Sequence, residues 1–178
     1  MSLQTATFGA GCFWCLDAAM NQLNGVKQAL SGYMGGPANL AHYQAVCSGQ
    51  SGHAEVVQVV FDPSIVSYEQ LCLVFFSLHD PTQLNRQGHD IGTQYRSVIF
   101  YHCPSQLALA EKLIKNLTEQ AVFNKTIVTA LTPASEFFAA EKQHQNYFQQ
   151  HPEQGYCQVI IAPKMAKFRQ QYSELLKS

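Results

Sequence analysis

The chain has 178 residues, of which 47% are hydrophobic and 13% are charged, and its formal net charge is −1. This composition is typical of a folded globular protein and excludes a disordered chain or a basic nucleic-acid-binding module. No run of about 18 or more apolar residues predicts a membrane-spanning helix, and the N-terminal segment has no secretion signal, so we expect a cytoplasmic protein.

Hydrophobic patterning in the first half of the chain predicts three strands and three helices. Apolar residues at Phe13, Leu16 and Met20 have helical spacing. A β-branched run that ends at Asp62-Pro63 is typical of a strand. The predicted elements are a strand at 3–9, a helix at 12–23, a strand at 26–34, a helix at 39–47 capped by Asn39, a strand at 53–61 and a helix at 67–78 capped by Ser67.

The second half opens with a polar, glycine-containing loop over 79–94. After it we predict a strand at 95–101, a helix at 105–122, a strand at 126–131, a helix near 139–149, a strand at 157–162 and a final helix from 164. Because strands and helices are mixed without strict alternation, we predict an α+β fold, a two-layer sandwich in which a mixed sheet packs with helices. No linker or repeat interrupts the sequence, so we expect a single catalytic domain over 1–178.

The segment around Cys12 is the strongest indication of chemistry. Gly9 and Gly11 allow a tight turn between the first strand and helix and leave Cys12 little shielded. In the first turn of a helix, unpaired N–H groups favour a thiolate, so we predict a reactive nucleophile with a lowered pKa. Phe13 and Trp14 follow directly, and an aromatic wall beside the sulfur suits a small apolar group such as an S-methyl.

Glu55 is the candidate acid. It begins a strand that is apolar on both faces, which indicates an interior strand. A carboxyl group on such a face is partly desolvated, so we expect a raised pKa and a proton available near neutral pH. The loop from Gln87 to Arg96 is dense in hydrogen-bonding groups, and such loops often contribute to sites.

The six cysteines are Cys12, Cys15, Cys47, Cys72, Cys103 and Cys157. In a reducing compartment such residues usually serve chemistry or packing and do not form permanent disulfides. The Cys12-x-x-Cys15 spacing permits a redox pair, and Cys157 could approach Cys12 if the fold brings them together. On spacing alone, a general CxxC dithiol–disulfide oxidoreductase remains an alternative.

Metal and cofactor sites are not indicated by the sequence. One CxxC is not followed by a second pair at zinc-site spacing, and Glu141-x-x-His144 occurs as a single half-motif. No glycine-rich nucleotide motif is present. We therefore expect no metal and no bound cofactor.

Several motifs, taken together and in order, resemble the peptide methionine sulfoxide reductase A family. The similarity covers about residues 6–170. The matching segments are Gly11-Cys12-Phe13-Trp14, Ser31-Gly32-Tyr33 with Gly35-Gly36, Val46-Cys47-Ser48-Gly49, Gly52-His53-Ala54-Glu55, His79-Asp80-Pro81, Gly92-Thr93-Gln94-Tyr95-Arg96-Ser97, His144-Gln145-x-Tyr147 and Gly155-Tyr156-Cys157.

This resemblance implies a ferredoxin-like sheet and an enzyme that reduces methionine S-sulfoxide, free or in proteins, and so repairs oxidised proteins. Cys12 would attack the sulfoxide sulfur and Glu55 would protonate the departing oxygen. Tyr43 and Tyr95 would hold that oxygen, and Asp90 would help to orient the site.

The resemblance also implies how substrate is held and how the enzyme is renewed. Phe13 and Trp14 would hold the methyl group. Attack leaves a sulfenic acid on Cys12, which a second cysteine converts to a disulfide. Thioredoxin, or dithiothreitol in vitro, would then supply electrons. The expected partners are oxidised methionine and thioredoxin, without nucleic acid or membrane, and we expect a monomer.

The sequence departs from the family pattern in three places. Cys15 stands where many members have glycine, so either Cys15 or Cys157 could be the resolving thiol. Asp17 stands where glutamate is usual. The stretch 37–42 before Tyr43 is shorter than usual and lacks the usual Asn-Pro.

Overall fold

The computed structural model describes residues 2–178. Its strands are β1 Gln4–Ala10, β2 Val26–Met34, β3 Ala54–Phe61, β4 Arg86–Gln87, β5 Asp90–Ile91, β6 Ser97–Tyr101, β7 Ala130–Pro133 and β8 Phe138–Ala139. Its α-helices are α1 Phe13–Met20, α2 Tyr43–Cys47, α3 Tyr68–Ser77, α4 Pro104–Glu119, α5 Tyr147–Gln150 and α6 Ala162–Gln171.

One sheet organises the molecule, with strand order β7-β6-β1-β3-β2-β8. Its four central strands, β6, β1, β3 and β2, pair with one another antiparallel, whereas β7 pairs parallel to β6. With α1 after β1 and α3 after β3, this strand order is the ferredoxin-like arrangement expected from the resemblance. The small β4–β5 hairpin forms separately.

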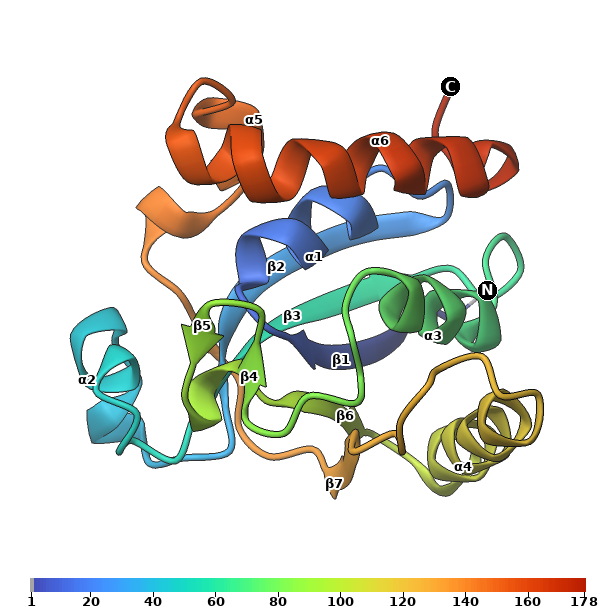
Figure 1. The fold of residues 1–178 in the computed structure, drawn as a ribbon, viewed down its shortest axis with the longest axis horizontal. Helices are drawn as coiled ribbons and strands as arrows, with labels where there is room; N and C mark the ends of the chain where they lie inside the picture. Colours follow the sequence, from blue (N-terminus) through green and yellow to red (C-terminus); the bar gives the residue numbers. More distant parts are fainter. Residues whose placement is uncertain (1) are drawn as a thin grey trace.

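The helices form a second layer on one face of the sheet. Figure 1 shows α1 beside β2 and α6, with α3 and α4 toward the other end. The main core combines side chains of this sheet face, such as Phe8 and Val59, with Leu16 of α1 and Phe75 of α3. A smaller cluster including Val56 lies on the opposite face, which Phe137 helps to cover. The predicted two-layer α+β fold is therefore confirmed.

Asp17 fixes α1 on the sheet. Its carboxylate is fully buried and accepts hydrogen bonds from the Ser31 hydroxyl at 2.9 Å and the Asn146 backbone N–H at 3.0 Å. Asn146 has a left-handed backbone, with φ of 53°. One carboxylate thus ties α1 to β2 and to the segment that leads into α5.

Several predicted boundaries hold and some elements differ. Ser67 caps α3, and its hydroxyl and the Gln70 side chain form a reciprocal capping box. The cap of α2 is His42, not Asn39, which lies in a preceding 3-10 turn over Ala38–Leu40. The polar loop contains the β4–β5 hairpin and a 3-10 turn over Thr93–Tyr95, after which β6 begins.

The prediction for the C-terminal third was wrong in two places. The helix expected near 139–149 is instead the end of β8, a 3-10 turn over Lys142–His144 and the short α5. The strand expected at 157–162 is a π-helical turn, Cys157–Ile161, that runs directly into α6. The edge of β2 that such a strand could have used is already paired with β8.

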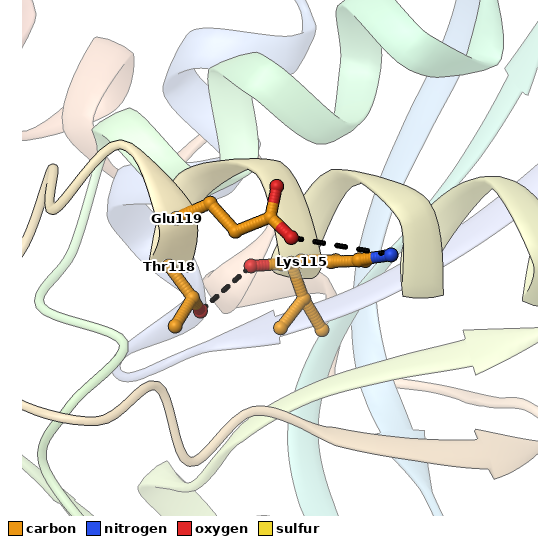
Figure 2. A network of polar contacts seen from close by, with 4 residues as sticks. Lys115, Thr118 and Glu119 are labelled. Carbon is orange, nitrogen blue, oxygen red and sulfur yellow. Dashed lines mark hydrogen bonds and ion pairs between the residues drawn. The ribbon is translucent and has the colours of Figure 1, made fainter.

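The outer surface of α4 is exposed, and the polar contacts drawn there join residues of the same helix. Figure 2 shows Lys115 and Glu119, whose ion pair spans 3.9 Å, and Thr118, whose hydroxyl donates to the Ile114 carbonyl. Among the helices of residues 2–178, none combines the length and apolar character needed to cross a membrane.

Candidate active site

A pocket of about 270 Å³ opens where β1 passes into α1. It brings together most of the residues expected from the sequence, which come from distant segments. The lining residues are Cys12, Phe13, Trp14, Tyr43, Glu55, Asp90, Tyr95, Gln154 and Tyr156. The chain thus delivers a thiol, two carboxyl groups, three tyrosines and two further aromatic rings to one small space.

Cys12 is the N-cap of α1 and is half-buried at the pocket. Gly11 precedes it with φ of 86°, a left-handed conformation that favours glycine, and a β-carbon there would lie only 2.8 Å from Gln87. The expected turn between β1 and α1 is therefore present and delivers the sulfur to the helix N-terminus.

The expected lowering of the Cys12 pKa was wrong. Burial and the neighbouring Glu55 carboxyl raise the pKa of the Cys12 thiol well above its ordinary value, although the Trp14 backbone N–H works in the opposite direction. One short helix end does not compensate for loss of water around the sulfur. Cys12 is thus a thiol at rest, and it depends on its surroundings to become a nucleophile.

Glu55 lies on the face of β3 that points toward the helices, and its side chain is 2% exposed. Its Oε1 accepts a hydrogen bond from the Phe13 backbone N–H at 3.2 Å. Burial raises the pKa of Glu55 to about 8, with a smaller contribution from the charge of Asp90. The expected desolvated carboxylic acid is therefore present, protonated at neutral pH and adjacent to Cys12.

The aromatic wall beside the thiol consists of Phe13 and Trp14. Phe13 is buried, whereas Trp14 is partly exposed, and both rings border the pocket. Trp14 stacks face to face on Tyr147 with ring centroids 3.7 Å apart, and Tyr156 meets it edge-on at 5.8 Å. These contacts hold the indole ring in place as a flat apolar surface.

Tyr43 and Tyr95 both line the pocket, and they come from two different segments of the chain. Tyr43 begins α2 and is 38% exposed, so the shortened stretch before it still presents the ring to the site. Tyr95 ends the 3-10 turn before β6. Burial is the main cause that raises the pKa of both hydroxyl groups, so each remains a hydrogen-bond donor at neutral pH.

Asp90 sits in the β4–β5 hairpin and accepts a hydrogen bond from the Tyr156 hydroxyl at 2.7 Å. Tyr156 and Gln154 were not among the residues expected to form the site. Tyr156 was within reach of sequence reasoning because it lies in the Gly155-Tyr156-Cys157 motif, but its contact with Asp90 depends on the fold.

The two candidate resolving thiols, Cys15 and Cys157, do not line the pocket. Cys15 is 4% exposed on the first turn of α1, and Cys157 is fully buried in the π-helical turn. Burial raises the pKa of Cys15 to about 11, and Cys157 is among the neighbouring groups that contribute. All six cysteines are free thiols in this structure.

Within residues 2–178, no three His, Cys, Asp or Glu side chains gather in a way that could hold a metal ion. Glu141 accepts hydrogen bonds from Tyr33 and Tyr43, and the His144 ring packs against the Tyr43 ring. A larger groove of about 970 Å³ lies between α3 and α6, but none of its lining residues is a cysteine. The smaller pocket around Cys12 is therefore the candidate site.

The chain is similar to known proteins in sequence and in fold. Residues 4–176 match the sequence model of the family described as peptide methionine sulfoxide reductase. A relative from Chromobacterium violaceum, named peptide methionine sulfoxide reductase MsrA, is 49% identical over 176 residues, which cover 99% of this chain and 100% of the relative.

Two solved structures of Mxr1 from Saccharomyces cerevisiae have the same fold. The reduced form is 30% identical, covers 87% of this chain and 89% of its own, and has a TM-score of 0.79. The form in complex with Trx2 matches with 23% identity, 82% and 84% coverage and a TM-score of 0.57.

Proposed function

This chain belongs to the peptide methionine sulfoxide reductase family and is an oxidoreductase that reduces methionine sulfoxide, and from this premise we propose that Cys12 is its attacking thiol. The observation that supports this most directly is the shared pocket of Cys12 and Glu55. A thiol that attacks sulfur and an acid that protonates the oxygen are the two groups the reaction requires.

In the first step, the Cys12 sulfur bonds to the sulfoxide sulfur while Glu55 gives its proton to the sulfoxide oxygen. The Cys12 proton replaces the one that Glu55 has given. The sulfur–oxygen bond of the substrate and the temporary sulfur–sulfur bond then break while a new sulfur–oxygen bond forms on Cys12, which leaves methionine and a Cys12 sulfenic acid. The methionine sulfur gains two electrons and the Cys12 sulfur loses two, so the step balances.

Protonated Glu55 also makes the attack easier. When Glu55 is ionised, its negative charge is one of the causes that raise the pKa of Cys12. With Glu55 neutral, that repulsion is absent when thiolate character develops on Cys12. A proton on Glu55 thus removes one of the two main causes that raise the pKa of Cys12, and burial of the sulfur remains as the other.

Tyr43 and Tyr95 are proposed to donate hydrogen bonds to the sulfoxide oxygen, and Asp90 to orient the site through Tyr156. Preorganised donors aimed at developing negative charge are an effective source of rate enhancement. The Asp90–Tyr156 hydrogen bond at 2.7 Å links the two sides of the pocket. This contact would keep the oxygen site narrow.

Phe13 and Trp14 are proposed to hold the S-methyl group. A wall on one side and hydroxyl donors on another would favour one configuration at sulfur, and we propose the S epimer. The small pocket requires only the methionine side chain, so free and protein-bound methionine sulfoxide both fit this reading.

Renewal requires a second thiol, and Cys15 and Cys157 are the two candidates. The sulfenic acid condenses with the second thiol to give a disulfide and water. Cys15 lies one turn along α1 from Cys12 and needs little change of fold. Cys157 is fully buried in the π-helical turn and must leave it to react.

Mass mapping after a single turnover distinguishes the two thiols. A Cys12–Cys15 disulfide that persists in Cys157→Ser identifies Cys15 as resolving. A Cys12–Cys157 disulfide that persists in Cys15→Ser identifies Cys157. A sulfenic acid that accumulates in both single variants would show that both are required.

We propose thioredoxin as the electron donor, with dithiothreitol as its substitute in vitro. The disulfide is reduced to two thiols while the donor dithiol becomes a disulfide, so electrons balance. A structure of the yeast protein with Trx2 has the same fold, which supports this choice. No metal or bound cofactor enters any step.

The test separates this function from general disulfide exchange. We expect release of methionine from S-methionine sulfoxide with dithiothreitol, and little reduction of insulin disulfides. Efficient insulin reduction without sulfoxide turnover would contradict the proposal and favour a general CxxC oxidoreductase, because disulfide exchange does not need Glu55 or the tyrosines.

A further inference from the structure

Glu141 joins two tyrosines through one carboxylate. Its Oε1 accepts a hydrogen bond from the Tyr33 hydroxyl at 2.9 Å, and its Oε2 accepts one from the Tyr43 backbone N–H at 2.9 Å. Tyr33 is fully buried on β2, so it is a fixed point, whereas Tyr43 begins α2. Burial works against charge on Glu141, but these hydrogen bonds outweigh it and lower its pKa, so the group is a carboxylate.

The hydrogen bond from Tyr43 to Glu141 matters because α2 is only five residues long. A helix of this length does not hold itself in place, and its position depends on contacts with the rest of the fold. The carboxylate satisfies an N–H at the first residue of α2, where unpaired donors favour negative charge. Glu141 therefore determines where α2 starts and where the Tyr43 ring can reach.

His144 also packs against Tyr43, the first residue of α2. It is 5% exposed, and neither of its ring nitrogens has a hydrogen-bond partner. Its ring centroid lies 4.5 Å from that of Tyr43, 5.6 Å from Phe13 and 6.0 Å from Trp14. The imidazole thus packs as a flat ring against three aromatic side chains of the pocket.

Both residues belong to one short segment. Glu141 is the N-cap of the 3-10 turn Lys142–His144, which follows β8. We propose that Glu141 and His144 are positioning residues for sulfoxide reduction. Together they set the distance between the tyrosine that holds the oxygen and the wall that holds the methyl group. This inference rests on the proposed role of Tyr43.

A double-mutant cycle tests the Glu141 contact. Glu141→Gln keeps the shape, but its amide cannot accept two hydrogen bonds at two oxygens. We expect kcat/KM to fall about 10- to 150-fold, the usual scale for a hydrogen bond to a charged group. When Glu141→Gln is added to Tyr43→Phe, kcat/KM should fall by less than a further factor of about two, because the hydroxyl that Glu141 positions is already absent.

The readouts distinguish positioning from general loss of structure. The rate at which iodoacetamide alkylates Cys12 should be unchanged in Glu141→Gln, because Cys12 does not depend on this contact. Glu136→Gln, an exposed glutamate a few residues earlier, is the matched control and should behave as wild type. Fully additive effects of the Glu141 and Tyr43 changes would overturn the inference.

The outcomes for the two proposals are separate. If Tyr43→Phe alone leaves kcat/KM unchanged, the proposed role of Tyr43 fails, and this inference fails with it. If Tyr43→Phe slows the enzyme but Glu141→Gln does not, only this inference fails.

For His144, the ring is the expected requirement. Because its nitrogens have no partners, His144→Phe should keep kcat/KM within about threefold of wild type, whereas His144→Ala should raise KM about tenfold by letting the wall collapse. Equal damage from both substitutions would show that a nitrogen is needed and would contradict this role.

Discussion

The pocket at α1 and the exposed surface of α4 contain the same kinds of side chain in opposite settings. Cys103 caps α4 at the surface, where the Ser105 hydroxyl and backbone N–H groups lower its pKa. Burial raises the pKa of Cys12. By pKa alone, Cys103 is the better nucleophile, but Cys12 shares its pocket with the acid Glu55 and the aromatic rings of Phe13 and Trp14. Reactivity toward a sulfoxide depends on neighbours as well as on thiolate content.

The carboxyl groups show the same contrast. Glu119 lies on α4 in an exposed ion pair, while Glu55 is buried with a single backbone donor. The first is a solvated charge and the second an acid held ready to give up a proton. The following predictions test how far this difference between surface and pocket extends.

The largest effect is expected at the two cysteines. Cys12→Ser should lower methionine release by at least about 10³-fold, because a hydroxyl is a far weaker nucleophile than a thiol here. Cys103→Ser should leave turnover unchanged. Conversely, iodoacetamide near pH 7.5 should alkylate Cys103 before Cys12, since the thiolate is the reacting form. Mass spectrometry of labelled peptides measures the order, and faster labelling of Cys12 would break the comparison.

The next effect concerns the proton on Glu55. Glu55→Gln should lower kcat about 10²- to 10⁴-fold, the usual range for a general acid. In wild type the acid is protonated below its pKa of about 8, so kcat/KM should fall as the pH rises through that value. The fall should be absent in the glutamine variant. A wild-type profile that keeps rising above pH 8 would argue against Glu55 as the proton donor.

The same substitution should have a smaller and opposite effect on stability. Burial raises the pKa of Glu55 from 4.5 to about 8, so the folded state disfavours the charged form. Stability should therefore decline as pH rises from about 4.5 to about 8 and then level off. At pH 8, Glu55→Gln should stabilise the fold by about 1–3 kcal/mol. Denaturant unfolding of both proteins at pH 6 and pH 8 measures this, and a variant less stable at pH 8 would contradict it.

The smallest effect is expected at the α4 surface in Figure 2. Lys115 and Glu119 lie 3.9 Å apart with side chains 74% and 62% exposed. Water and salt screen such a pair, so Glu119→Gln should change the free energy of unfolding by less than about 0.5 kcal/mol. Activity should be unchanged. A loss as large as that expected for pocket residues would show that α4 is coupled to the site.

Local patterns predicted the central elements well because they depend on burial. The strand at 53–61 is apolar on both faces, and β3 indeed lies inside the sheet. A carboxyl group on such a strand loses contact with water, and the raised pKa of Glu55 follows from that. Ser67 and Gln70 satisfy each other within one helical turn, so that cap was visible locally too.

The C-terminal third could not be predicted in the same way. The run after Cys157 is rich in β-branched residues, but a short apolar run does not distinguish a strand from a helix. Val159 is 71% exposed and Ile161 is fully buried in the main core, so only one face of this π-helical turn packs against the rest of the fold. Likewise, the pKa of Cys12 depends on burial by distant segments, which outweighs the helix end that the sequence reveals.

One contact described above bears on how the enzyme can change over evolutionary time. Phe13 holds Glu55 through its main-chain N–H and not through its ring. Any residue except proline supplies that N–H at position 13. The contact with Glu55 therefore places no requirement on the side chain at position 13, whose ring is buried against Tyr33 and His144. A change of the Phe13 side chain would thus alter the aromatic packing of the pocket without removing the hydrogen-bond donor to Glu55.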